Sequence, residues 1–123
     1  MFKKIISILI AAISISIGAN TLSAASKFIP GINDLPLMAG LALKSETPMV
    51  FDTPGGRIVE VFASGKITAA RIRAFYGETL PQLGWKPAAP SEFQRDKERL
   101  KIEISEDNKG GRVVRFSVVP NAQ

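Results

Sequence analysis

The chain of 123 residues contains no cysteine and no histidine. Without a thiol it can form no disulfide, no thiolate nucleophile and no cysteine-based zinc site. A bacterial lipoprotein signal, which must end at a cysteine, is excluded for the same reason. Without an imidazole, the Ser-His-Asp and Cys-His catalytic arrangements are excluded as well. Acid–base chemistry would be left to carboxylates, lysines and the single tyrosine, Tyr76.

A strong excess of one charge is also missing. The chain has 16 Lys and Arg against 11 Asp and Glu, for a net charge of +5. Lys3 and Lys4 belong to the N-terminal segment, so the rest of the chain carries 14 basic and 11 acidic residues, a net +3. Nucleic-acid binding requires a clustered basic face. No such cluster is visible, and we predict no nucleic-acid partner.

Residues 1–25 have the organisation of a cleavable secretory signal peptide. A short basic segment with Lys3 precedes the uncharged, mostly apolar stretch Ile5–Ala19, and small residues follow up to the predicted cleavage point after Ala24 or Ala25. An uncleaved membrane anchor is the alternative, but a spanning helix needs about 20 apolar residues and this stretch is shorter. We therefore expect a periplasmic or secreted protein with no stable membrane span after cleavage.

Residues 26–47 form an irregular apolar N-terminal arm. Its prolines and glycines argue against one long helix. Its large apolar side chains argue against a solvated linker. The arm either lies across the domain and covers its core, or it is a binding surface for a partner. In the second case the candidate contact residues are Leu35, Leu37, Met38 and Leu41.

Residues 48–120 are predicted to form one compact domain, followed by a tail at 121–123. The domain begins with two strands, Met49–Asp52 and Arg57–Ala63, which are joined by a turn rich in proline and glycine. The glycine pair of this turn is followed by a strand and lacks the lysine of a phosphate loop, so it predicts a hairpin and no nucleotide site.

An amphipathic helix is predicted between Ala69 and Leu83, because apolar residues recur there at intervals of three and four. Thr68 is its expected N-cap, and Gly84 is expected to end it in the left-handed conformation. Pro81 predicts a kinked or tightened last turn. We expect Trp85, directly after the helix, to fold back onto the junction between helix and sheet.

The rest of the chain reads as three strands. Lys86–Pro90 is predicted to be a connection, and the strands are Glu92–Arg95, Arg99–Ser105 and Arg112–Val119. The last two alternate apolar and polar residues, as in a sheet with one solvated face. The predicted fold class is α+β, with a single amphipathic helix packed on one face of an antiparallel sheet and the order β-β-α-β-β-β.

Two groups of acidic residues are candidates for chemistry. Asp52 and Glu60 flank the first hairpin, and if they faced each other they could act as the paired carboxylates of a hydrolase or lyase. Glu106–Asn108 superficially resembles a calcium loop, but the alternating ligands of such a loop are missing, and a solvated hairpin tip is favoured.

Aromatic and basic residues give two further candidates. Tyr76 and Trp85 could form a sugar-stacking platform, although half-buried aromatics at the edge of the core explain them better. Basic residues on the outer faces of the last strands could attract an anionic lipid or polymer. They are Arg99, Lys101, Arg112 and Arg115.

The helix carrying Phe75-Tyr76 and ending in Leu83-Gly84-Trp85 resembles a motif of small exported bacterial proteins of unknown function. The resemblance extends from about Pro48 to Pro120 and includes Phe93-x-Arg95, Leu100-x-Ile102 and Val114-x-Phe116. It implies a compact envelope domain without known activity. It carries over no functional residue.

These observations predict a non-enzymatic binding or protein-interaction module of the cell envelope, with no cofactor and no metal. Its partner is expected to be another envelope protein, contacted through the arm or the outer sheet face. The alternatives are a small carboxylate-dependent hydrolase or lyase, and a carrier of an apolar ligand held between helix and sheet.

Overall fold

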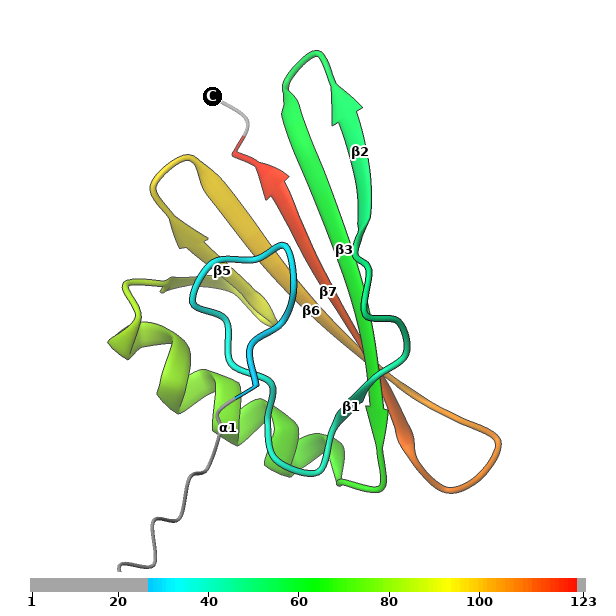
Figure 1. Ribbon diagram of the computed structural model, residues 1–123. Helices are drawn as coiled ribbons and strands as arrows, with labels where there is room; N and C mark the ends of the chain where they lie inside the picture. Colours follow the sequence, from blue (N-terminus) through cyan, green and yellow to red (C-terminus); the bar gives the residue numbers. More distant parts are fainter. Residues whose placement is uncertain (1–26, 122–123) are drawn as a thin grey trace, which may run out of the picture.

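The computed structural model describes residues 27–121, which form one α-helix and a seven-stranded antiparallel sheet (Figure 1). The predicted α+β fold, with one helix on one face of an antiparallel sheet, is confirmed. The predicted signal peptide and the last two residues lie outside the described part of the chain. The elements are β1 (Ala42–Leu43), β2 (Met49–Thr53), β3 (Gly56–Gly65), α1 (Ala69–Gln82), β4 (Lys86–Ala89), β5 (Glu92–Arg95), β6 (Glu98–Glu106) and β7 (Arg112–Pro120).

The strands lie in the order β1-β3-β7-β6-β5-β4, and β2 also pairs with β3. β1 and β2 share one edge of β3: β1 pairs with its end around Ser64, whereas β2 pairs with its beginning, from Gly56 to Glu60. The other side of β3 is taken by β7. The sheet therefore ends at β1 and β2 on one side and at β4 on the other.

The structure contains two strands beyond the predicted ones, so the observed order is β-β-β-α-β-β-β-β. β1 is a two-residue strand within the predicted arm. β4 occupies the segment whose prolines predict a connection. Pro87 is compatible with a strand there because β4 lies at the edge of the sheet and has a strand on one side only.

Helix α1 begins and ends as its sequence predicts. The Thr68 hydroxyl accepts a hydrogen bond from the Arg71 N–H at 3.2 Å. At the other end Gly84 has φ of 90°, the Gly84 N–H donates to the Pro81 carbonyl at 3.2 Å, and the Trp85 N–H donates to the Leu80 carbonyl at 3.0 Å. These two bonds form a Schellman motif. It tightens the last turn and directs the chain back toward the sheet.

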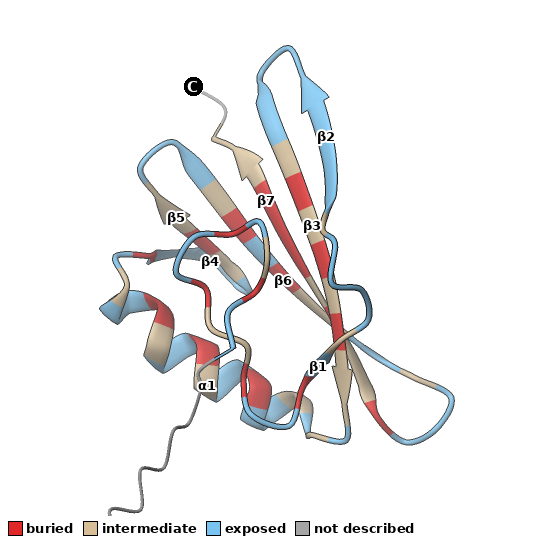
Figure 2. Ribbon diagram, in the orientation of Figure 1, coloured by how far each residue is buried: buried red, intermediate tan, exposed pale blue. Residues whose placement is uncertain are grey.

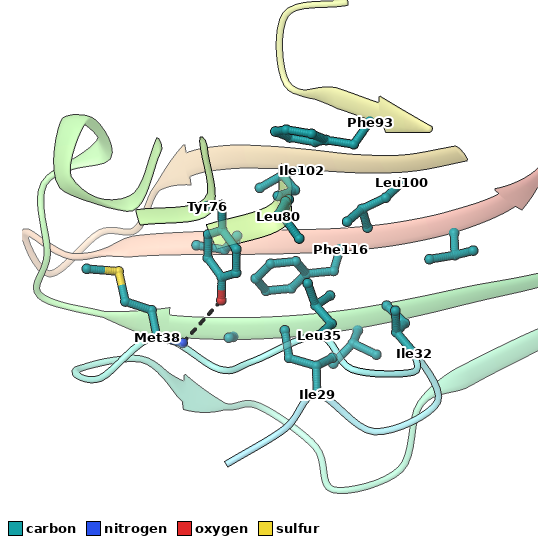
Figure 3. Close-up of a cluster of buried hydrophobic side chains, with 14 of the residues drawn as sticks. Ile29, Ile32, Leu35, Met38, Tyr76, Leu80, Phe93, Leu100, Ile102 and Phe116 are labelled. Carbon is teal, nitrogen blue, oxygen red and sulfur yellow. Dashed lines mark hydrogen bonds between the residues drawn. The ribbon is translucent and has the colours of Figure 1, made fainter. Parts of the chain in front are cut away.

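The core lies between the sheet and a cover made of α1 and the arm (Figures 1 and 2). The inward residues of the central strands include Val61, Leu100 and Phe116, all at most 2% exposed. The arm adds Ile29, Ile32 and Leu35 to the same cluster, as Figure 3 shows. A single helix cannot cover a sheet of this width, and the arm supplies the remaining apolar cover. No helix within residues 27–121 is long and apolar enough to cross a membrane.

Tyr76 joins the helix to the arm. Its hydroxyl donates to the Pro36 carbonyl at 2.9 Å. It also accepts from the Met38 N–H at 3.1 Å, the bond drawn in Figure 3. Its ring meets Phe116 edge-on, with centroids 5.2 Å apart. Burial raises the pKa of Tyr76 to about 12, an effect that the hydrogen bond from Met38 partly offsets. The neutral phenol is therefore part of the fold.

We expect this phenol to make stability fall at alkaline pH. The unfolded chain releases the proton near the ordinary pKa of 10.0, whereas the folded chain holds it to about 12. The contribution is complete below pH 10 and is lost as pH rises to 12, by roughly 2–3 kcal/mol. Urea unfolding across this range checks the prediction. Because Tyr76 is the only tyrosine, its deprotonation can be followed directly by tyrosinate absorbance.

The matched variant is Tyr76→Phe. At neutral pH it should lose about 1–3 kcal/mol, because the Met38 N–H and the Pro36 carbonyl lose their partner. Above pH 10 its decline should be shallower than that of the native chain, because the variant has no phenol to deprotonate. Parallel declines in the two proteins would show that Tyr76 does not carry the effect.

Candidate functional site

The four arm residues predicted as partner contacts do not form one surface. Leu35, Met38 and Leu41 are 0%, 8% and 7% exposed, and all three belong to the core cluster. A partner cannot reach such side chains while the domain is folded. Leu37 is half-buried against the same cluster. For these residues the structure supports the alternative interpretation, in which the arm is internal cover.

One part of the arm remains accessible. A surface groove of about 440 Å³ is lined by Leu37 and by Phe28, which is 58% exposed; Leu41 also borders the groove but is itself only 7% exposed. The Phe28 ring is the only strongly exposed aromatic group of the arm within residues 27–47. The groove is therefore the remaining place where the arm itself could be contacted.

Asp52 and Glu60 do not converge. Asp52 pairs with Arg57 across the hairpin, so these two side chains share one face of the sheet. Glu60 lies three positions beyond Arg57, and side chains alternate along a strand, so its carboxylate lies on the opposite face. The paired-carboxylate arrangement on which the hydrolase or lyase alternative depends is absent at this hairpin.

The aromatic platform and the calcium loop are also not formed. Tyr76 and Trp85 are 1% and 0% exposed, so neither ring offers a face to a sugar. The Asp107 carboxylate accepts the N–H groups of Lys109 and Gly111 at 2.8 and 2.7 Å, which closes its own turn and lowers its pKa. Residues 27–121 contain no group of three side chains placed to hold a metal ion.

The basic residues of the outer face, which is the face opposite α1 and the arm, are paired with acids. Arg115 lies between Glu60 and Glu103 and donates to both, at 2.8 Å to Glu103. Lys101 contacts Glu103 at 3.1 Å. These contacts raise the pKa of Arg115 and lower that of Glu103. A further pair on this face is Arg99–Glu92. Arg112 was predicted on the same face, but it lies three positions from Arg115 and side chains alternate along a strand, so it belongs to the opposite face, where it pairs with Glu106. The basic side chains of the outer face are therefore neutralised by neighbouring carboxylates, and this face is not a basic patch.

A cavity lies between α1 and the sheet. Its volume is about 110 Å³, and its walls are mainly apolar, with Ile72, Phe93 and Ile102 among them. A carrier site for an apolar ligand usually has at least a few hundred cubic ångströms. The cavity is too small for the predicted carrier function.

The exposed apolar residues that remain gather on β2. Met49, Val50 and Phe51 are consecutive and are 47%, 38% and 48% exposed. The whole strand is exposed in Figure 2, and the β2–β3 hairpin extends beyond the arm and the helix (Figure 1). Among the described strands, only β3 pairs with β2, so one side of its backbone is open. An open apolar edge of this kind is a template for pairing with another chain.

The opposite edge of the sheet is protected. β4 begins with Lys86 and Pro87, is interrupted by a bulge between Pro87 and Ala89, and ends at Ala89, directly before Pro90. Lysine, proline and bulges are the devices by which natural sheets block pairing at an edge. β2 has no lysine, proline or bulge within its five residues; its one charged residue is Asp52, and Pro48 and Pro54 flank it. The β4 edge therefore carries features that block pairing with another strand, whereas the β2 edge lacks these features.

The open edge continues into an apolar row on the outer face. Phe51 lies opposite Ile58. The register between Val59 and Val118 places Val119 on the same face, beside Ile58. The next row contains Met49 and Glu60, where the ion pairs begin. We define the β2 edge as Met49, Val50 and Phe51 together with Ile58, and this surface is the candidate functional site.

Sequence reasoning identified β2 as a strand but missed that it is an exposed edge. The only local signal was the pair of flanking prolines, which mark a short strand with defined ends. Comparison of the chain with protein-family models, with curated proteins and with solved structures finds no match. The resemblance to small exported bacterial proteins therefore stays a prediction.

Proposed function

We propose that this chain is a non-catalytic protein-interaction module of the bacterial cell envelope, and that it binds an extended segment of its partner along the β2 edge. The observation that carries the proposal is the contrast between the two edges of the sheet. β4 carries a lysine, a proline and a bulge, whereas β2 presents three exposed apolar side chains beside an open backbone. Blocking one edge while leaving the other open restricts pairing to a single place.

Strand addition suits this surface. A partner segment in extended conformation supplies backbone hydrogen bonds to the open side of β2, and alternate side chains supply specificity. Phe51 and Ile58 offer it an apolar row, and Pro48 and Pro54 limit the paired length to about five residues. The envelope location rests on the signal-like segment at residues 1–25 and on the resemblance described above.

The proposal is tested by photo-crosslinking in the cells that make the protein. A photoreactive residue replaces Phe51 in one full-length variant and Ala88, on the protected β4 edge, in another. We expect discrete adducts from position 51, identified by mass spectrometry, and none of these from position 88. Equal yields from both positions, or no adduct from position 51, would contradict the proposal.

Binding to the captured partner is then measured with purified proteins. Phe51→Lys puts a charge on the apolar row and should weaken binding by about tenfold or more, which corresponds to about 1.4 kcal/mol. The matched control is Phe28→Lys, because Phe28 is similarly exposed but belongs to the arm groove. If Phe28→Lys weakens binding and Phe51→Lys does not, the arm groove is the contact surface and the β2 edge is not.

A further inference from the structure

The open side of β2 has a defined set of backbone groups. The turn at Pro54 and Gly55 closes on Thr53 and Gly56, which face each other. Backbone N–H and C=O groups alternate between the two sides of an antiparallel strand. Thr53, Phe51 and Met49 therefore direct theirs toward β3, whereas Val50 and Asp52 direct theirs to the open side.

We propose that a second copy of this chain pairs with β2 in antiparallel orientation, with the two-fold axis at Phe51. The inference rests on the proposed function, because it names the partner of the same edge. Val50 of each copy then exchanges two backbone hydrogen bonds with Asp52 of the other, which satisfies the open groups on both. The two sheets become one continuous antiparallel sheet.

The register follows from the ends and the charge of β2. With the axis at Phe51, all five residues from Met49 to Thr53 are paired, and Pro48 and Pro54 lie just outside. Asp52 then faces Val50 of the other copy. Moving the axis to Asp52 would place two carboxylates directly opposite each other, which destabilises a strand pair. It would also leave only three residues paired before Pro54.

A second copy also brings matching apolar side chains together across the axis. The two Phe51 rings meet in a non-hydrogen-bonded pair, in which side chains approach most closely, and aromatic cross-strand pairs stabilise antiparallel sheets. The apolar rows of the two copies join end to end through these rings. Each copy contributes Phe51, Ile58 and Val119 to the joined row.

The interface is small, so the dimer is expected to be weak and to depend on concentration. Interfaces below about 1,200 Å² of buried surface belong to transient complexes. The average mass measured by light scattering should therefore rise from monomer toward dimer between micromolar and about 1 mM protein. Phe51→Lys should stay monomeric over this range, and Phe28→Lys should behave like the native chain. If the native chain still has a monomer mass at 1 mM protein, its dimerisation is weaker than a Kd of 1 mM, which corresponds to a binding free energy of about −4 kcal/mol. That result would overturn the proposal.

The absence of native cysteine permits a direct test of the register. In the proposed pairing Met49 lies opposite Thr53 of the other copy, whereas the two Met49 residues are separated by four positions, about 13 Å along the strand. A disulfide requires Cα atoms about 4.4–6.8 Å apart. When Met49→Cys and Thr53→Cys proteins are mixed and mildly oxidised, the mixed dimer should dominate. A statistical mixture of the three dimers, or no disulfide above that formed by Phe28→Cys, would overturn the register.

These results separate the inference from the proposed function. A protein that stays monomeric at 1 mM but yields a different chain from position 51 in cells would contradict self-pairing and leave the interaction module standing. A protein that dimerises with the predicted cross-links would support both. A monomer that yields no adduct from position 51 would contradict both.

Discussion

Replacing Trp85 with alanine is expected to lower the free energy of unfolding by about 3–5 kcal/mol. The side chain is fully buried directly after the end of α1, in the core cluster to which the sheet and the arm also contribute. The Arg95 guanidinium lies 4.3 Å from the centre of the indole ring. Arg95 also donates to the carbonyls of Leu83 and Asn33, which connects the helix end to the arm. Removing the indole leaves a cavity in this core, and the loss is a large part of the stability of so small a domain.

The measurement is urea unfolding followed by far-ultraviolet circular dichroism, because the variant lacks the only tryptophan. Trp85→Phe is the matched control and should cost less, about 1–2 kcal/mol. It keeps an aromatic ring beneath Arg95, and the indole N–H finds no hydrogen-bond partner within residues 27–121, so no such bond is lost. If Trp85→Ala unfolds within about 1 kcal/mol of the native chain, Trp85 does not hold the helix end, the sheet and the arm together.

In the arm, Leu35→Ala is expected to cost about 2–5 kcal/mol, whereas Leu37→Ala, two residues away, should cost about 1 kcal/mol or less. Leu35 is fully buried among the core side chains, whereas Leu37 is half-buried at the surface groove. The same chemical change is therefore made in two neighbouring leucines that differ in burial. Thermal or urea unfolding of the two variants measures the difference.

This pair of leucines also decides what the arm does. A large effect at Leu35 with a small one at Leu37 means that the arm is a structural cover of the sheet. Equal small effects would mean that the arm leaves the sheet in solution and exposes the apolar surface beneath it. The contact surface would then have to be sought on the arm again, and not on β2.

Much of the fold could be predicted because its signals are local. The Thr68 cap, the apolar intervals of α1 and the glycine at position 84 each act within a few residues, and all three appear in the structure. The tightened turn at Pro81 is equally local, because proline has no backbone N–H to donate to the carbonyl one turn earlier in the helix. The alternation along Leu100–Ile104 places apolar residues on the inner face for the same reason, because side chains alternate along any strand.

The candidate site could be predicted only in part. The sequence identifies Met49–Asp52 as a strand, but an apolar strand reads alike whether it lies in the middle of a sheet or at its edge. The prolines of Lys86–Pro90 predict a connection, yet an edge strand tolerates Pro87. From the sequence alone, the apolar arm residues Leu35 and Met38 are equally compatible with a core and with a contact surface. Only their burial in the folded domain distinguishes the two.

The sequence by itself determined the position and ends of the helix, the hairpin at Pro54 and Gly55, and the exclusion of thiol and imidazole chemistry. These depend on residue types and on interactions between near neighbours. Only the tertiary structure decided that the arm covers the core, that Asp52 and Glu60 lie on opposite faces, and that β2 is the open edge. Each of these depends on pairing between segments far apart in the chain, because a residue's burial is set by what packs against it.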